Sequence, residues 1–280
     1  MSAKTKPPAA SPNGPAAEPR PMTVPEFTAA KERGVKLTML TAYDYTLARL
    51  LDDAGVDGIL VGDSLGMVVQ GNDDSLSVTL EEMIYHARMV MRGAKRCLVV
   101  ADMPFMSFQV SPQQAVENAG RLMKEAGVHA VKLEGGVRSA ATIAAIASID
   151  IPVMAHIGLT PQSVRRLGGF RVQRHADQLL ADARAVEKAG AFAVVLECIP
   201  AEAAARITGE LKVPTIGIGA GAGCDGQVLV TPDLLGLFDK FKPRFVKQFA
   251  NLGQEVERAV KEYCREVRAG SFPAAEHGFR

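Results

Sequence analysis

Three stretches of the chain repeat one pattern, in which a helix ends at an Ala-Gly pair and a short apolar run then leads to a carboxylate. The pattern joins Ala54-Gly55 to Asp63, Ala126-Gly127 to Glu134, and Ala189-Gly190 to Glu197. The glycine fits a helix C-terminus, where the left-handed conformation is usual, and the apolar run fits a strand buried on both faces. The pattern therefore predicts parallel βα units whose carboxylates gather at the C-terminal ends of the strands, where such folds build their sites.

A fourth apolar run, residues 98–101, ends in Asp102, and further strand-like runs bring the count to eight. The predicted strands lie near residues 37–42, 58–62, 97–101, 129–134, 152–156, 192–197, 214–218 and 244–248. Helical patterns separate most of them, which favours an α/β fold of the (β/α)8 TIM-barrel type. The last crossover is the least regular, since residues 219–226 look like a loop and only 232–238 look helical. A doubly wound open sheet stays open as an alternative, because periodicity does not show whether a sheet closes.

Local signals mark the starts of two predicted helices. Thr79-Leu80-Glu81-Glu82 and Ser111-Pro112-Gln113-Gln114 are capping-box sequences, in which the first and fourth side chains satisfy free amides reciprocally. A predicted final helix carries an apolar stripe on one face, made of Leu252, Val256, Val260, Cys264 and Val267.

The two ends of the chain differ in composition from the middle. Residues 1–22 are rich in Pro and Ala and lack the apolar run of a signal peptide, which predicts a disordered N-terminal tail. We expect a single (β/α)8 catalytic domain over residues 23–270 and a C-terminal tail over residues 271–280.

Charge and cysteine content limit the possible partners. A net charge of +1 gives no general attraction to nucleic acid or to an anionic membrane, so small molecules are the expected partners. Four widely spaced cysteines form no CxxC pair, which argues against a zinc cluster and a disulfide scaffold and predicts a cytoplasmic location. No apolar run reaches the roughly 18 residues that a membrane span needs.

The charged residues at the predicted strand ends have structural interpretations as well as functional ones. Lys132 and Glu134 share one face of a strand, which requires either a polar barrel mouth or a mutual ion pair. Asp63 is compatible with a helix cap, and Asp102 with a turn. His156 is compatible with a hydrogen-bonded core histidine. The residue pattern alone leaves these alternatives open.

Seven motifs at the strand ends occur in an order that resembles the ketopantoate hydroxymethyltransferase family, also called 3-methyl-2-oxobutanoate hydroxymethyltransferases. The resemblance covers roughly residues 23–268. The motifs are Leu40-Thr41-Ala42-Tyr43-Asp44, Val61-Gly62-Asp63-Ser64-Leu65-Gly66-Met67, Ala101-Asp102-Met103-Pro104-Phe105, Val131-Lys132-Leu133-Glu134-Gly135-Gly136, Ala155-His156-Ile157-Gly158-Leu159-Thr160-Pro161-Gln162, Leu196-Glu197-Cys198-Ile199-Pro200 and Ile216-Gly217-Ile218-Gly219-Ala220-Gly221.

The resemblance implies a fold, a reaction and an assembly. The fold is a barrel of the phosphoenolpyruvate/pyruvate superfamily. In the reaction, 5,10-methylenetetrahydrofolate donates a hydroxymethyl group to 3-methyl-2-oxobutanoate through a metal-stabilised enolate. The product is 2-dehydropantoate, an intermediate of pantothenate and coenzyme A biosynthesis. The family uses Mg²⁺ and assembles as homo-oligomers, commonly decamers.

Carried over residue by residue, the resemblance also implies a metal and substrate site. Asp63 and Asp102 would contact the metal directly, and Glu134 would reach it through water. Ser64 and Lys132 would hold the ketoacid together with the two aspartates. This set is chemically reasonable, because Mg²⁺ prefers oxygen ligands and keeps several waters, so a few carboxylates suffice.

Glu197 matches the family's proton acceptor, and His156 lies in a matching motif that makes it a candidate supporting residue. Two other functions are alternatives to this one. Carbon–carbon lyases and phosphonomutases of the same superfamily typically carry a nucleophilic Cys loop, which this sequence lacks. A non-catalytic ketoacid or metal sensor would need no proton acceptor such as Glu197.

The sequence departs from the family in one loop. Members usually carry a longer segment after Gly168-Gly169-Phe170-Arg171-Val172-Gln173, whereas here Arg174-His175-Ala176 leads almost at once into the next helix. The loop lies near the site in the family. We therefore expect the shorter loop to affect folate contacts or lid closure and to leave the metal ligands unchanged.

Overall fold

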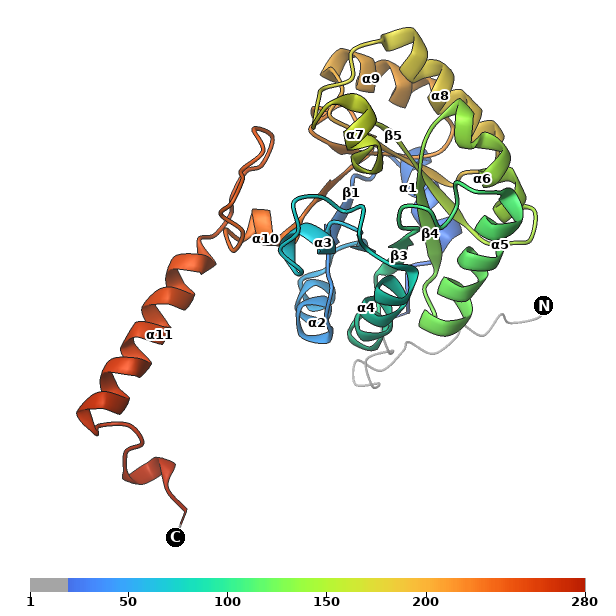
Figure 1. Cartoon of the computed structure of the whole chain (residues 1–280). Helices are drawn as coiled ribbons and strands as arrows, with labels where there is room; N and C mark the ends of the chain where they lie inside the picture. Colours follow the sequence, from blue (N-terminus) through green and yellow to red (C-terminus); the bar gives the residue numbers. More distant parts are fainter. Residues whose placement is uncertain (1–19, 280) are drawn as a thin grey trace, which may run out of the picture.

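The computed structural model of the chain describes residues 20–279. Eight parallel strands follow one another around a closed barrel, in which β1 pairs with both β2 and β8. Helices surround the barrel (Figure 1). The predicted (β/α)8 barrel is confirmed, and the open sheet is wrong. The strands are β1 (Leu37–Thr41), β2 (Gly58–Val61), β3 (Leu98–Asp102), β4 (Ala130–Glu134), β5 (Val153–Gly158), β6 (Ala193–Glu197), β7 (Thr215–Ile218) and β8 (Gly226–Leu229).

The helices begin and end largely where local signals place them. Gly55, Gly127 and Gly190, the glycines of the repeated pattern, have φ angles of 90°, 78° and 100°, so each adopts the expected left-handed conformation. The helices are α1 (Val24–Glu32), α2 (Tyr45–Ala54), α3 (Leu65–Val68), α4 (Leu80–Gly93), α5 (Pro112–Arg121), α6 (Ala140–Ala147), α7 (Val164–Leu167), α8 (Ala176–Lys188), α9 (Ala201–Glu210), α10 (Thr231–Leu234) and α11 (Leu252–Ala269).

One of the two predicted capping boxes forms completely. Thr79 Oγ1 accepts a hydrogen bond from Glu82 N at 3.2 Å, and Glu82 Oε2 accepts one from Thr79 N at 2.7 Å. Ser111 Oγ likewise accepts from Gln114 N at 3.1 Å. The reciprocal half is wrong for the second box, because the buried Gln114 Oε1 has no hydrogen-bond partner among residues 20–279.

The prediction of the eighth strand at residues 244–248 is wrong. The strand is β8, which follows β7 after a glycine-rich loop and without a crossover helix. Unlike β2 and β7, which are equally short, β8 interrupts its apolar pattern with the exposed Gln227, and it was missed for that reason. The apolar residues at 245 and 246 instead lie in a turn, in which Val246 N donates to Pro243 O at 3.0 Å.

The barrel interior changes from apolar to ionisable along its axis. In β4, Ala130 belongs to the apolar interior, and the next inward positions are Lys132 and Glu134. In β5, Met154 is apolar and His156 follows it. Because inward positions alternate along each strand, the ionisable side chains gather at the C-terminal end of the barrel.

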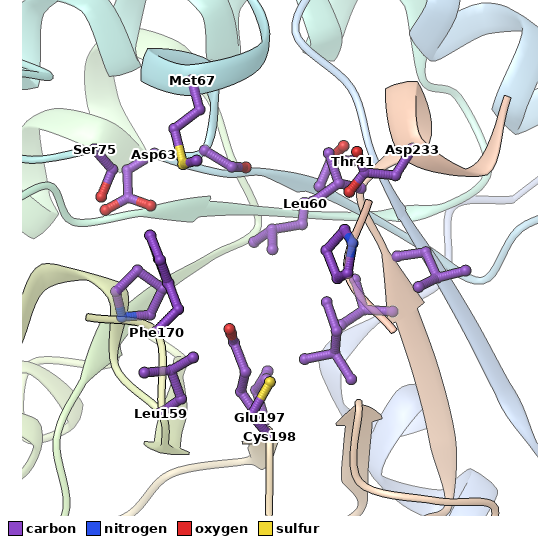
Figure 2. Close-up of a pocket in the computed structure, with 18 of the residues that line it drawn as sticks. Thr41, Leu60, Asp63, Met67, Ser75, Leu159, Phe170, Glu197, Cys198 and Asp233 are labelled. Atoms are coloured by element: carbon purple, nitrogen blue, oxygen red, sulfur yellow. The ribbon is translucent and has the colours of Figure 1, made fainter. Parts of the chain in front are cut away.

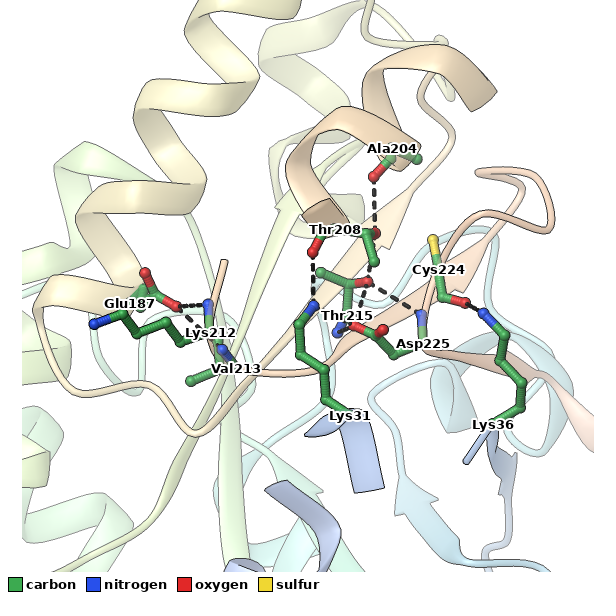
Figure 3. Close-up of polar contacts among 10 residues, drawn as sticks. All are labelled: Lys31, Lys36, Glu187, Ala204, Thr208, Lys212, Val213, Thr215, Cys224 and Asp225. Atoms are coloured by element: carbon green, nitrogen blue, oxygen red, sulfur yellow. Dashed lines mark hydrogen bonds and ion pairs between the residues drawn. The ribbon is translucent and has the colours of Figure 1, made fainter. Parts of the chain in front are cut away.

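Helix α1 closes the opposite, N-terminal end. Phe27 is fully buried, and its ring meets that of Phe192 edge-on with centroids 5.9 Å apart. Lys31 Nζ lies 2.8 Å from Asp225 Oδ2 and donates to Thr208 O at 2.6 Å (Figure 3). A second apolar layer, between the strands and the outer helices, completes the core.

Helix α11 extends away from the barrel (Figure 1). It contains no buried residue, and its apolar Val256, Val260 and Tyr263 are 55%, 54% and 57% exposed. The predicted stripe therefore forms a face that residues 20–279 of one chain do not cover. None of the described helices combines the length and the apolar character that crossing a bilayer requires. The predicted N-terminal tail lies outside the described residues apart from residues 20–22.

Candidate active site

A cavity of about 360 Å³ opens at the C-terminal ends of the barrel strands. Figure 2 shows side chains projecting toward it from several strands, among them Asp63 and Glu197. The structure brings together every site residue that the sequence predicted. The seven that line the cavity are Asp63, Ser64, Asp102, Lys132, Glu134, His156 and Glu197.

Asp63 and Asp102 meet as neighbours because β2 and β3 pair in parallel. Asp63 N donates to Asp102 Oδ2 at 3.0 Å, and Lys132 Nζ lies 2.7 Å from Asp102 Oδ1. The helix-cap interpretation of Asp63 is wrong, since the N-cap residue of α3 is Ser64 and no side chain caps this helix. The mutual Lys132–Glu134 ion pair is also wrong, because Lys132 pairs with Asp102 instead.

The cavity buries more carboxyl groups than cationic groups. Asp63, Asp102, Glu134 and Lys132 are each at most 5% exposed. Burial, reinforced by the charge of Asp102, raises the pKa of Asp63 to about 7. Burial and the charge of Asp63 also raise the pKa of Glu134 well above its usual value. Burial disfavours the Lys132 ammonium, yet Asp102 and Glu134 outweigh that effect and raise its pKa. Three acids thus share one cation.

This imbalance fits a divalent cation. The buried Asp102 Oδ1 has no well-oriented hydrogen bond among residues 20–279, although Lys132 lies close to it. In the same part of the chain, no three His, Cys, Asp or Glu side chains already converge on one ion position. A Mg²⁺ site does not require that, since Mg²⁺ usually keeps several waters and takes only one or two carboxylates from the protein.

Gln162 links two of these acids. Its Nε2 donates to Asp63 Oδ2 at 2.9 Å and to Met103 O at 3.0 Å, and its backbone N donates to Glu134 Oε2 at 3.1 Å. Gln109 Nε2 donates to Gln162 Oε1 at 2.9 Å, which fixes the orientation of the amide. Gln162 therefore positions Asp63 and Glu134 relative to each other.

His156 lies between the acid cluster and Glu197. Its Nε2 is 3.2 Å from Glu197 Oε2, and its Nδ1 is 3.4 Å from Lys132 Nζ. Burial, together with the charge of Lys132, lowers the pKa of His156, so the imidazole is neutral at neutral pH. A neutral imidazole offers one donor and one acceptor, but Nε2 forms no well-oriented hydrogen bond with residues 20–279, so His156 lies against Glu197 without fixing its carboxylate.

Tyr43, which follows the C-terminal end of β1, forms a hydrogen bond with Ser64. The Tyr43 hydroxyl and Ser64 Oγ are 2.9 Å apart, and either can donate. Burial raises the pKa of Tyr43, so the phenol stays protonated. The pair presents Ser64 in a defined position next to Asp63.

The sequence prediction missed Gln162, Tyr43 and Asp233 as site residues. Gln162 and Tyr43 lie inside motifs that carried the resemblance, and a polar side chain directly after a predicted strand was the available signal. Asp233 gave no such signal, because an acid in the first turn of a helix is common.

The loop after β5 forms part of the rim. Phe170 and Val172 line the cavity and are 48% and 46% exposed. Gln173 N donates to Cys198 O at 3.0 Å, which connects this loop to the end of β6. The loop therefore still reaches the cavity.

Solved structures that resemble this fold include a phosphonopyruvate hydrolase in complex with oxalate and Mg²⁺. It aligns with a TM-score of 0.61 and 15% identity over 92% of each chain. A 2,3-dimethylmalate lyase of the PEP mutase/isocitrate lyase superfamily aligns with a TM-score of 0.60 and 19% identity, over 91% of this chain and 88% of the lyase. These similarities establish the shared barrel fold.

The sequence comparisons establish the family. The protein named 3-methyl-2-oxobutanoate hydroxymethyltransferase from Enterococcus faecalis is 58% identical over 262 residues, which cover 92% of this chain and 95% of the relative. The protein of the same name from Syntrophus aciditrophicus is 54% identical over 264 residues, covering 93% and 97%. The family model for ketopantoate hydroxymethyltransferase matches residues 21–275. This chain therefore belongs to the ketopantoate hydroxymethyltransferase family.

Proposed function

We propose that this protein transfers a hydroxymethyl group from 5,10-methylenetetrahydrofolate to 3-methyl-2-oxobutanoate. The product would be 2-dehydropantoate, for pantothenate and coenzyme A biosynthesis. The observation that carries the proposal is the meeting of Asp63, Asp102, Lys132, Glu134 and Glu197 in one cavity of a chain that belongs to this family.

Asp63 and Asp102 would hold Mg²⁺ directly, and Glu134 would hold it through water. The excess of buried carboxylates over the single Lys132 supports this assignment. When bound, the ion would supply positive charge at the ketoacid oxygens, where an enolate develops its negative charge.

Lys132 and Ser64, with Asp63 and Asp102 beside them, would bind the carboxylate and keto group of the ketoacid. The buried Lys132 ammonium places a second positive charge where the enolate forms, and it acts there in a site of low dielectric constant.

Glu197 would remove the proton from the carbon next to the ketone. His156 Nε2 lies 3.2 Å from the Glu197 carboxylate and would support it from one side. The resulting carbanion would attack the methylene carbon of the folate. As the new carbon–carbon bond forms, the first of the two C–N bonds of that carbon would break, and water would then displace the second folate nitrogen and become the new hydroxyl group. The two nitrogens would take up the proton held by Glu197 and the proton released by water, so tetrahydrofolate leaves.

We also propose a cytoplasmic homo-oligomer, with a decamer as the family's common assembly. The apolar face of α11, which includes Val256 and Val260, supports association, since exposed contiguous apolar surface commonly marks an interface. Light scattering of the full chain tests the assembly.

An assay with 3-methyl-2-oxobutanoate and 5,10-methylenetetrahydrofolate, with and without a chelator, tests the reaction. We expect 2-dehydropantoate to form, and Mg²⁺ to restore its formation after chelation. In deuterated water without folate, NMR should show exchange of the hydrogen next to the ketone. Absence of both turnover and exchange, in protein reloaded with Mg²⁺, would refute the proposed function.

A further inference from the structure

Asp233 is a carboxylate of the cavity that the chemistry above does not use. It lies on α10 and lines the same cavity as the acid cluster. Figure 2 shows Asp233 near Thr41, toward the opposite side of the view from Asp63 and Ser75. Burial is the one cause that raises its pKa, to about 6, since no charge or hydrogen bond from the described residues compensates it. Its carboxylate is therefore available to a ligand.

The position of Asp233 is fixed by the barrel. Thr231 N donates to Thr41 Oγ1 at 3.0 Å, and Thr231 Oγ1 donates to Thr41 O at 2.6 Å. Both threonines are buried, with 0% and 2% exposure. Two hydrogen bonds to the end of β1 thus hold the first turn of α10, and Asp233 stands on a rigid support.

The part of the cavity lining that comes from residues 228–245 is mostly apolar and aromatic. Besides Asp233 and Arg244, it includes Val228, Val230 and the rings of Phe238, Phe241 and Phe245. A flat heterocycle packs well against such rings, and a carboxylate within apolar walls forms strong hydrogen bonds to paired N–H donors. An acidic group in this setting selects a planar ligand that presents two adjacent N–H groups.

We propose that Asp233 binds the 2-amino and N3–H groups of the pterin ring of the folate co-substrate, through its two carboxylate oxygens. The acids at the ends of β2, β3, β4 and β6 would then bind the ketoacid, and the part of the cavity lined by residues 228–245 would bind the folate. This inference rests on the proposed function, because it assigns a residue to the co-substrate of that reaction.

Asp233→Asn tests the assignment, with Asp239→Asn as the matched control. Asn keeps the size of the side chain but replaces one acceptor with a donor, which faces an N–H group of the pterin. Asp239 is exposed in the segment just beyond α10 and lines no part of the cavity. We expect Asp233→Asn to raise the KM for 5,10-methylenetetrahydrofolate by about tenfold to a hundredfold, the usual effect of losing hydrogen bonds to a charged group. Asp239→Asn should leave it unchanged.

The ketoacid half of the reaction provides an internal standard. Deuterium exchange into 3-methyl-2-oxobutanoate without folate should be the same in wild type, Asp233→Asn and Asp239→Asn. If Asp233→Asn keeps the exchange rate, the turnover and the folate KM of the wild type, the inference is overturned and the proposed function stands. If Asp233→Asn loses exchange as much as it loses turnover, the inference is also overturned, because Asp233 would then serve the ketoacid.

A tetrahydrofolate analogue without the 2-amino group gives a test that does not depend on the variant. Calorimetry should show that wild type binds this analogue about tenfold or more weakly than tetrahydrofolate. Asp233→Asn should distinguish the two ligands much less. If wild type binds both equally well, Asp233 does not contact that edge of the ring, and the inference fails even when Asp233→Asn does not fold.

Discussion

The two ends of the barrel use carboxylates in opposite ways. At the N-terminal end, Asp225 Oδ2 accepts from Thr215 N at 2.9 Å and lies 2.8 Å from Lys31 Nζ (Figure 3). Asp52 Oδ1 accepts from the backbone N–H groups of Arg96 and Cys97 at 2.9 and 2.8 Å. Each of these acids has its own donors. They stabilise the fold.

At the C-terminal end, the acids outnumber their donors. Asp63 and Glu134 are buried beside Asp102, and their pKa values rise, whereas the pKa of Asp52 falls. A buried charge without sufficient partners costs stability, and such costs are usual at functional sites. The arrangement of hydrogen-bond donors, rather than burial itself, therefore separates the acids that stabilise the barrel from those that can bind a ligand.

The largest expected effect is on turnover, from changing Glu197 at the C-terminal end. Glu197→Gln keeps the size of the side chain but cannot accept the proton, so kcat should fall by roughly 10²–10⁴-fold with little change in ketoacid affinity. The control is Glu187→Gln at the other end, where Glu187 Oε1 accepts from Lys212 N and Val213 N (Figure 3). That variant should lose stability and keep its kcat. If calorimetry showed instead that Glu197→Gln no longer binds the ketoacid, Glu197 would be a substrate-binding residue and not the proton acceptor.

Asp63→Asn should separate activity from stability. We expect activity to fall by about a hundredfold or more, because the neutral amide no longer balances a metal ion or the charge that develops in the reaction. The Tm without metal should stay equal or rise, since the substitution removes a buried charge that lacks sufficient partners. Thermal unfolding in chelator and an activity titration with Mg²⁺ measure the two effects. Full activity of the variant in chelator would contradict the metal assignment.

Asp52→Asn should do the reverse and lower stability without changing the chemistry. Burial alone would raise the pKa of Asp52, but the hydrogen bonds from Arg96 N and Cys97 N outweigh it and lower the pKa. A lowered pKa in the folded state stabilises the protein above the unfolded pKa of about 3.9, and this contribution disappears as the pH falls through the folded pKa.

The loss of stability in Asp52→Asn should therefore be about 1–3 kcal/mol at pH 7 and shrink below about pH 4. Urea unfolding of wild type and variant at a series of pH values measures it. If the difference in unfolding free energy between wild type and variant grew toward low pH, it would have the wrong sign, and the Asp52 carboxylate would not stabilise the fold.

The smallest effect concerns Cys198, which lines the cavity next to Glu197. Burial, helped by the charge of Glu197, raises the pKa of the Cys198 thiol to about 12, so the reactive thiolate is scarce at neutral pH. Cys198→Ser should keep most of the activity, and alkylation of this thiol should become rapid only at strongly alkaline pH. Mass spectrometry of iodoacetamide-treated protein follows the modification. Loss of activity on alkylation at pH 7 would point instead to a nucleophilic cysteine.

Much of the barrel was predictable because local and global signals agree. The glycines at 55, 127 and 190 end helices in the left-handed conformation, and the apolar runs after them form β2, β4 and β6. The strand β8 was not predictable from its own sequence. Its place depends on pairing with β1 and β7, which no local pattern encodes.

The site was predictable where a charged side chain ends a strand, and less so where it does not. Asp102, Glu134 and Glu197 are the last residues of their strands, so periodicity alone places them at the barrel mouth. Gln162 and Asp233 follow irregular or short helical segments. Their positions arise from contacts with Asp63 and from the anchoring of α10 on β1, which exist only in the folded chain.

Helix α1 has a consequence for how the chain folds during synthesis. It leaves the ribosome well before its partners, which lie far ahead in the sequence. Thr28 bonds to Phe192, and Lys31 bonds to Thr208 and Asp225, over separations of 164, 177 and 194 residues. Contacts of such long range form slowly, because a large loop must close first. The apolar side of α1 therefore remains exposed to chaperones and to other chains until β6 to β8 have been synthesised.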